Sequence, residues 1–264
     1  MAKWRLVIKT LPWVMLVLVL VYIRQYVLGV RSLVDFGDIS AVLTGAALIV
    51  GFMLAGVISD YKESEKLPGE LAASMEAFDD AIVAGSGGTK GFDAGPFRRR
   101  YGETVSVIEG WFMNRGTVAS CLQALQRMNG LIADLEKTGL HVIFVSRCMA
   151  EQHTLRRLVT RIDVIRRTHF IETCYALLQM FVITAIALMI FSGFRDWVVQ
   201  FLVVGTLSLI YLYLLRFIRD LDDPFEYAGG YRKDMTADVD PYPVVEFCRR
   251  YQESLAAHAG SVRA

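Results

Sequence analysis

Histidine, cysteine and carboxylate side chains carry most metal and catalytic chemistry, and in this sequence none of them forms a local motif. No two histidines have the HExxH spacing or a comparable ligand spacing, and no two cysteines form a CxxC pair. The residues concerned are His141, His153, His169, His258, Cys121, Cys148, Cys174 and Cys248. No local Ser-His-Asp or Cys-His signature is present either, although such triads also assemble from distant positions. The sequence therefore predicts a protein that is not an enzyme, with reduced thiols, no metal site and no cofactor.

A glycine-rich stretch at residues 85–91 (GSGGTKG) has some of the composition of a phosphate-binding loop. The stretch does not meet the G-x-x-x-x-G-K-[ST] pattern, and no predicted strand precedes it. Gly95-Pro96 then interrupts the chain again, as is typical of loops. We therefore predict a flexible linker over residues 85–95 rather than a phosphate site.

The overall composition is that of a membrane protein. Hydrophobic residues make up 54% of the 264 residues, and the mean hydropathy is +0.40. Soluble domains reach about 45–50% apolar residues by a count that also includes glycine. The formal net charge is +1, so no overall basic field argues for nucleic-acid binding.

Four apolar runs are candidates for transmembrane helices, which need about 20 residues to cross about 30 Å of hydrocarbon. Residues 39–58, 173–194 and 198–215 contain no charged side chain. The first run is interrupted by Arg24, which we expect to snorkel, so that a tilted helix over about residues 10–29 spans the membrane. The basic N-terminus also fits a signal peptide, but no small-x-small cleavage site follows. We predict a retained first span.

The distribution of Lys and Arg predicts the orientation of the spans. With four spans, the short connections on one side carry Arg24, Arg31 and Arg195, and the remaining basic residues lie on the side of the termini. The positive-inside rule places that side in the cytoplasm. We therefore expect a multi-pass protein of a bacterial-type inner (plasma) membrane, with both termini cytoplasmic.

The spans divide the chain into four parts. Residues 1–59 hold the N-terminal segment and the first two spans, residues 60–172 a cytoplasmic helical region, residues 173–218 the other two spans, and residues 219–264 a cytoplasmic tail. Apolar residues recur at helical spacing in the cytoplasmic region, and we expect one long helix to continue without a break into the third span. The predicted fold class is all-α: a polytopic membrane protein with four transmembrane helices and long cytoplasmic helices.

Five arginines gather near the boundary between the cytoplasmic region and the third span: Arg156, Arg157, Arg161, Arg166 and Arg167. We favour a solvated helix face combined with positive-inside anchors as the interpretation of this cluster. The alternative is a basic vestibule that concentrates anions or contacts anionic lipid.

Two short stretches carry a family resemblance. The last part of the second span begins with Gly51-Phe52 and is followed by Leu67-Pro68, and the fourth span is followed by Asp223-Pro224-Phe225. In order and in placement these stretches resemble landmarks of the bestrophin family, whose second helix carries Gly-Phe before a Leu-Pro and whose fourth helix precedes Asn/Asp-Pro-Phe. The Arg-Trp-Trp of that family is replaced here by Asp60-Tyr61-Lys62, which marks a divergent, bestrophin-like sequence.

The resemblance implies a homopentamer around an ion pore, with a hydrophobic neck on the second helix. Position by position, the neck falls on Phe52, Leu48 and Thr44, which are four residues apart and therefore share one helix face. Five copies would stack apolar rings that gate by dewetting. Thr44 departs from the bulky residue of the family, which implies a wider opening. The alternative is that Leu48 and Phe52 pack between helices.

The resemblance also implies a cytoplasmic mouth, formed by Asp220, Asp222, Asp223, Pro224 and Phe225. Animal bestrophins bind calcium through acidic side chains after the Pro-Phe. That acidic run is missing here, so calcium gating is not expected. The alternatives for these carboxylates are a solvated helix end or ion pairs with Arg216 or Arg219.

The predicted function is that of an oligomeric channel subunit that conducts small anions such as chloride. Its partners are then copies of itself, membrane lipid and small ions, with no nucleic acid. The basic residues favour anions, whereas the carboxylates at the mouth favour cations. A non-conducting membrane scaffold or signalling protein is the main rival. A proton-driven stator-type energiser is disfavoured, because the spans contain no carboxylate or histidine for a proton relay.

Overall fold

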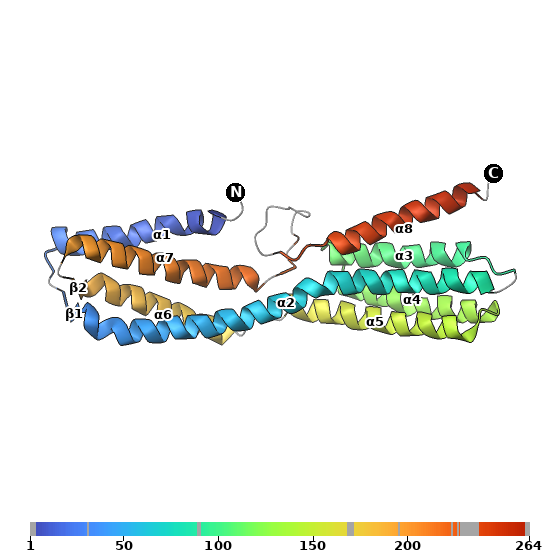
Figure 1. The fold of residues 1–264 in the computed structure, drawn as a ribbon, viewed down its shortest axis with the longest axis horizontal. Helices are drawn as coiled ribbons and strands as arrows, with labels where there is room; N and C mark the ends of the chain where they lie inside the picture. Colours follow the sequence, from blue (N-terminus) through green and yellow to red (C-terminus); the bar gives the residue numbers. More distant parts are fainter. Residues whose placement is uncertain are drawn as a thin grey trace. The chain divides into compact units, whose positions relative to one another are not determined.

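The computed structural model describes residues 4–30, 32–88, 91–167, 172–194, 196–222, 224–225, 227 and 238–261. Its helices, drawn in Figure 1, confirm the predicted all-α fold class. In chain order the elements are α1 (Arg5–Tyr22), the π-helical turn η2 (Ile23–Val27), β1 (Val34–Asp35), α2 (Phe36–Gly88), α3 (Gly95–Phe112), α4 (Val118–Lys137), α5 (Val142–Arg167), α6 (Glu172–Phe191), β2 (Ser192–Gly193), α7 (Trp197–Leu221) and α8 (Tyr242–Ser261).

The chain divides into two compact units. The membrane unit contains α1, η2, β1, α2 up to Tyr61, α6, β2 and α7. The second unit contains α2 from Lys62 onward, α3, α4, α5 and α8. Each unit has its own apolar core, and the two are described separately below.

Among the described residues, four helices are long and apolar enough to cross a membrane, as predicted. These candidate spans are Arg5–Val27, Phe36–Gly87, Thr173–Phe191 and Trp197–Leu221. In the most apolar stretch of 18 residues of each helix, only 22% of the residues are buried inside the chain. Most of the apolar surface of these helices therefore faces outward. Helices that are apolar on nearly all sides are typical of membrane spans, and the chain is a multi-pass membrane protein.

The core of the membrane unit draws side chains from all four of these helices. Its buried members include Val21, Val50, Val182, Val204 and Ile218. Figure 1 shows α1 lying along α7 within this unit. A short parallel pairing of β1 with β2, with Val34 opposite Ser192, joins the segment before α2 to the end of α6.

The third span ends earlier than the sequence predicts. The helix α6 stops at Phe191, because Ser192 and Gly193 pair with β1 instead of continuing the helix. A Cβ atom at Gly193 would lie 2.6 Å from the Ser32 Oγ, so this close approach of two segments requires a glycine. The predicted continuous helix from the cytoplasmic region into this span would pass through residues 168–171. These four residues lie outside the described residues.

The prediction that Arg24 snorkels toward an interface is wrong, because the residue is buried and only 6% exposed. It lies in the π-helical turn η2, and its Nη1 donates a hydrogen bond to the Ser192 carbonyl oxygen at 3.2 Å. Gln200 Nε2 donates to the same carbonyl at 3.3 Å. A cation at the C-terminal end of a helix is stabilised by unpaired carbonyls and the helix dipole. The end of α6 therefore explains why this arginine turns inward.

The helix α2 extends further than the sequence predicts. It continues through Pro68 and includes residues 85–88 of the expected linker, so the connection to α3 starts after Gly88. Gly85 is buried, and a Cβ atom there would lie 2.5 Å from Leu140 Cδ1 and 3.3 Å from Phe144 Cγ. This glycine therefore serves close packing inside the second unit rather than flexibility.

The second unit is a helical bundle in which α3 packs on α4 and α8, and α4 packs on α5. The apolar residues that recur at helical spacing form its core, as predicted. They include Val105, Ile108, Trp111, Leu125, Leu131, Leu155 and Leu158. The turn between α3 and α4 contains Asn114, whose φ of 58° lies in the left-handed region that asparagine tolerates.

Candidate functional site

The predicted neck residues Thr44, Leu48 and Phe52, called the α2 row below, lie on the membrane part of α2 and outside the core. Phe52 is 72% exposed and Leu48 is 55% exposed, and Thr44 is exposed as well. The other helices of the same chain do not cover this face. The alternative that Leu48 and Phe52 pack between helices therefore does not hold within one chain.

The opposite face of α2 holds the row in its outward orientation. Its buried side chains are Ile39, Leu43, Ala46, Val50 and Val57, at helical spacing and inside the core of the membrane unit. The Tyr211 hydroxyl of α7 donates a 2.7 Å hydrogen bond to the Leu43 carbonyl oxygen. Packing on one side of a helix fixes the direction of the other side, so the α2 row is directed away from the core.

Small residues surround the α2 row. Exposed alanine and glycine occur at Ala41, Gly45, Ala47, Gly51 and Ala55. A Cβ atom added at Gly45 or Gly51 would meet no heavy atom within 4 Å. Leu48 and Phe52 are therefore bulky side chains that stand among small residues. Another helix or another copy of the chain can approach this face closely.

The α2 row is chemically apolar. No charged residue occurs between Asp38 and Asp60 in the sequence. The Thr44 hydroxyl donates to the Ser40 carbonyl oxygen at 2.8 Å, so its proton is used within the helix. Such a face can form a hydrophobic constriction, but it offers no charge that could hold an ion or activate a substrate.

The predicted mouth residues are divided between the two units. Asp220 and Asp222 lie at the end of α7 in the membrane unit, on either side of the buried Leu221. Asp223 lies outside the described residues. Arg216, one of the expected ion-pair partners, donates a hydrogen bond to the Lys9 carbonyl oxygen.

Phe225, the last predicted mouth residue, belongs to the core of the second unit and is 1% exposed. Its ring centroid lies 6.2 Å from that of Phe112 and 6.5 Å from that of Tyr227. Asn114 Nδ2 donates to the Phe225 carbonyl oxygen at 3.1 Å. This arrangement makes Phe225 an anchor in a protein interior rather than a side chain at an open mouth.

Arg166 completes this aromatic socket, which we define as Trp111, Phe112, Phe225 and Tyr227. Its guanidinium carbon lies 5.0 Å from the Trp111 ring centroid and 5.6 Å from that of Phe225. Arg166 Nη1 also donates to the Trp111 carbonyl oxygen at 3.1 Å, at the C-terminal end of α3. The sequence pattern favours Arg166 as part of a solvated face with positive-inside anchors, whereas its position inside the socket depends on contacts between helices that are distant in the sequence.

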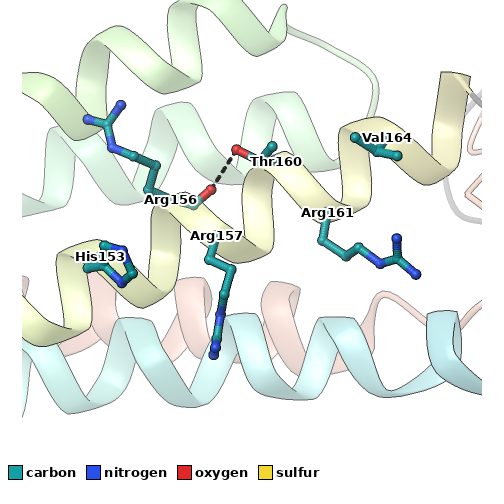
Figure 2. Close-up of a pocket in the computed structure, with 6 residues that line it drawn as sticks. All are labelled: His153, Arg156, Arg157, Thr160, Arg161 and Val164. Atoms are coloured by element: carbon teal, nitrogen blue, oxygen red, sulfur yellow. Dashed lines mark hydrogen bonds between the residues drawn. The ribbon is translucent and has the colours of Figure 1, made fainter.

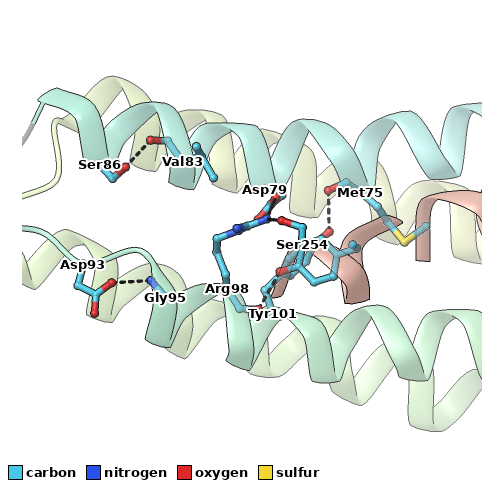
Figure 3. A network of polar contacts seen from close by, with 10 residues as sticks. Met75, Asp79, Val83, Ser86, Asp93, Gly95, Arg98, Tyr101 and Ser254 are labelled. Atoms are coloured by element: carbon cyan, nitrogen blue, oxygen red, sulfur yellow. Dashed lines mark hydrogen bonds and ion pairs between the residues drawn. The ribbon is translucent and has the colours of Figure 1, made fainter. Parts of the chain in front are cut away.

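A second polar network ties α2, α3 and α8 together in the second unit. Figure 3 shows Asp79 and Arg98 facing each other, with two parallel hydrogen bonds of 2.8 Å from Arg98 Nε and Nη2. Arg98 also donates to Ser254 Oγ at 3.0 Å, and Tyr101 donates to the Met75 carbonyl oxygen at 3.0 Å. Burial raises the pKa of Tyr101 well above its ordinary value. The fully bonded network is structural, since every donor named here already has a partner within the fold.

The cysteines are free thiols, as predicted. Cys121, Cys148 and Cys248 are buried in the second unit, and desolvation raises the pKa of each thiol to about 12. A thiol that stays protonated at neutral pH is a poor nucleophile. Within the described residues, no three His, Cys, Asp or Glu side chains are grouped so that they could hold a metal ion.

Comparisons with known proteins bear on the fold of the chain. No family model and no curated protein matches the sequence. A crystal structure of a bacterial bestrophin homologue from Klebsiella pneumoniae has a TM-score of 0.74 and 16% identity, over 96% of this chain and 98% of that chain. A single-substitution variant of that homologue has a TM-score of 0.73 and 14% identity, over 96% and 99%. A structure described as a membrane protein has a TM-score of 0.72 and 14% identity, over 94% and 97%.

The four candidate spans and the helical second unit define an all-helical, multi-pass membrane protein. Its fold is that of the bacterial bestrophin homologues over nearly the whole chain. The resemblance that rested on a few short sequence stretches is therefore confirmed at the level of the fold.

Proposed function

We propose that the chain is one subunit of a homopentameric ion channel that conducts small anions such as chloride. The observation that supports this most directly is the α2 row, whose bulky apolar side chains are exposed on a helix whose opposite face packs into the core. The bestrophin fold supports the pentamer that the sequence resemblance implies. In this proposal, the copies surround one axis and turn their α2 rows toward it.

The α2 row would then act as a hydrophobic neck. Successive members are one helical step of four residues apart, which separates their rings by about 6 Å along the axis. A narrow apolar constriction dewets and blocks ions, and a small widening lets water and ions return. The surrounding small residues allow neighbouring helices to approach closely, so Leu48 and Phe52 would set the narrowest point.

The choice of anions rests on charge outside the neck, because an apolar ring itself selects weakly by charge. The second unit carries several exposed arginines, including Arg147, Arg157 and Arg161. Asp220 and Asp222 at the end of α7 would favour cations, and the proposal requires that the basic residues dominate. The proposed location is an inner membrane with both termini in the cytoplasm, following the distribution of Lys and Arg.

Chloride efflux from liposomes tests the proposed function. The purified protein is reconstituted into vesicles loaded with potassium chloride, and external chloride is followed after a valinomycin-driven start. Native mass spectrometry of the same sample gives the number of copies. The proposal expects a pentamer and chloride release well above that of empty vesicles. A stable monomer, or a pentamer whose vesicles release no more chloride than empty vesicles, would contradict it.

A further inference from the structure

An open basic groove lies on one face of α5 in the second unit. Its volume is about 540 Å³, and its lining residues are His153, Arg156, Arg157, Thr160, Arg161 and Val164. Figure 2 shows Arg156 extending from one side of the helix, and Arg157 and Arg161 extending from the other side toward α2. All the lining residues come from α5, so one face of this helix forms the floor of the groove between the guanidinium groups.

The positive charge of this groove is only partly neutralised. Arg161 forms an ion pair with Glu63 of α2, with 2.7 Å between Nη2 and Oε1. In the part of the chain that the structure describes, neither Arg156 nor Arg157 has a carboxylate within 4.0 Å. By contrast, Arg249 of α8 pairs with carboxylates on its own helix. Arg156 and Arg157 therefore keep their guanidinium groups available for an external anion.

The arrangement suits a phosphate-bearing anion better than a halide. A guanidinium group is planar, carries five N–H donors and matches the oxygens of a phosphate in a two-point contact. Two such groups on opposite sides of an open floor can each bind a different phosphoryl oxygen. A volume of this size belongs to the range of small-molecule sites, about 300–1,000 Å³, and is far larger than one halide requires.

We propose that the α5 groove is a binding site for a multivalent anion with two or more phosphoryl groups. Arg156 and Arg157 hold the phosphoryl oxygens, and His153 lies at one end as an additional hydrogen-bonding group. Glu63 competes with the anion for Arg161. The site does not depend on ion conduction, so it stands or falls separately from the proposed channel function.

Isothermal titration calorimetry with inorganic pyrophosphate tests the site on the full-length protein in a zwitterionic detergent at low ionic strength. The double variant Arg156→Gln/Arg157→Gln should bind at least about tenfold more weakly, because two charge-assisted contacts are lost. Arg147→Gln is the matched control, since Arg147 is an exposed arginine of the same helix outside the groove. Glu63→Gln should bind more tightly, because it releases Arg161.

A second arm distinguishes a free anion from a lipid headgroup as the source of the phosphoryl groups. Retention of cardiolipin, an anionic lipid with two phosphate groups, is measured by native mass spectrometry in the same variants. Pyrophosphate binding that the double variant loses identifies a soluble ligand. Lipid retention that the double variant loses, without pyrophosphate binding, identifies a headgroup. If the double variant and Arg147→Gln behave alike in both arms, or if neither probe binds the unmodified protein, the site does not exist.

Discussion

The Tyr211 hydroxyl of α7 donates a 2.7 Å hydrogen bond to the Leu43 carbonyl oxygen of α2, one residue before the first member of the α2 row. Both residues are buried in the core of the membrane unit. The bond therefore fixes the back of α2 against α7 at the level of Thr44. This hydrogen bond stabilises the position of the proposed neck from the buried face of α2, away from the proposed ion path.

Removing this bond should loosen the support without removing the neck. Tyr211→Phe keeps the ring and is expected to cost about 1 kcal/mol, as is typical of a single hydrogen bond between helices in a membrane. The measurement is the thermal midpoint of the detergent-solubilised protein. Tyr213→Phe, on the same helix and half-buried, is the control. An equal midpoint for Tyr211→Phe and the unmodified protein would show that the bond does not stabilise the fold.

Breaking the buried pair of Asp79 and Arg98 should destabilise the second unit strongly. Asp79→Ala leaves a largely buried guanidinium without its carboxylate, and such a loss costs about 3–5 kcal/mol. The exposed pair of Arg100 and Asp134 offers a matched control, because removal of an exposed pair costs about 0–1 kcal/mol. Hydrogen exchange of α3 and α8 amides reports the effect within this unit. Equal exchange in Asp79→Ala and Asp134→Ala would contradict the structural role of the network.

The aromatic socket predicts that replacing Phe225 lowers the stability of the second unit strongly. Phe225→Ala removes a buried ring from contact with Phe112 and Arg166, and large-to-small changes of this kind cost about 3–5 kcal/mol. Tyr227→Phe loses the 2.8 Å hydrogen bond to the Val239 carbonyl oxygen and should cost about 1 kcal/mol. Thermal unfolding of both variants checks this order. A smaller effect for Phe225→Ala than for Tyr227→Phe would show that Phe225 is not an anchor.

The buried thiols predict a loss of stability at alkaline pH. Burial raises the pKa of Cys121, Cys148 and Cys248 to about 12 in the fold, from about 8.5 in the unfolded chain. The unfolded state therefore releases these protons first, and the stability that is fully present below about pH 8.5 declines as the pH rises toward 12.

Thermal midpoints between pH 8 and 10.5 should fall less steeply in the triple Cys→Ala variant than in the unmodified protein. A thiol reagent at pH 8, read by mass spectrometry at each site, should leave all three thiols unlabelled until the protein is unfolded. Rapid labelling of any of them in the folded protein would contradict the burial on which this prediction rests.

The sequence predicts the features that depend on local pattern. Long runs without charge identify three spans, a run interrupted by Arg24 identifies the first, and four-residue steps put Thr44, Leu48 and Phe52 on one face. Both follow from helix geometry alone. The extent of Leu48 and Phe52 exposure was not predictable, since periodicity does not tell which apolar face a chain leaves uncovered.

The features that the sequence does not predict depend on contacts between distant residues. Arg24 turns inward because the end of α6 brings the Ser192 carbonyl oxygen within reach. Gly85 is a packing position rather than part of a linker, because a Cβ atom there would lie 2.5 Å from Leu140 Cδ1 and 3.3 Å from Phe144 Cγ. Phe225 lies in a core because Arg166 and Phe112 gather around it. The local sequence assigned Arg24 to an interface and Gly85 to a linker, and the family resemblance assigned Phe225 to a mouth.

Single-channel recording in planar bilayers tests the central claim most directly. The purified protein, Phe52→Ala and Leu202→Ala are compared in a potassium chloride gradient; Leu202 is a matched control, since it is 65% exposed on α7. The account predicts discrete currents that reverse near the chloride equilibrium potential, altered conductance or open probability in Phe52→Ala, and unchanged currents in Leu202→Ala. Silent bilayers from verified oligomers, or identical currents in all three proteins, would contradict it.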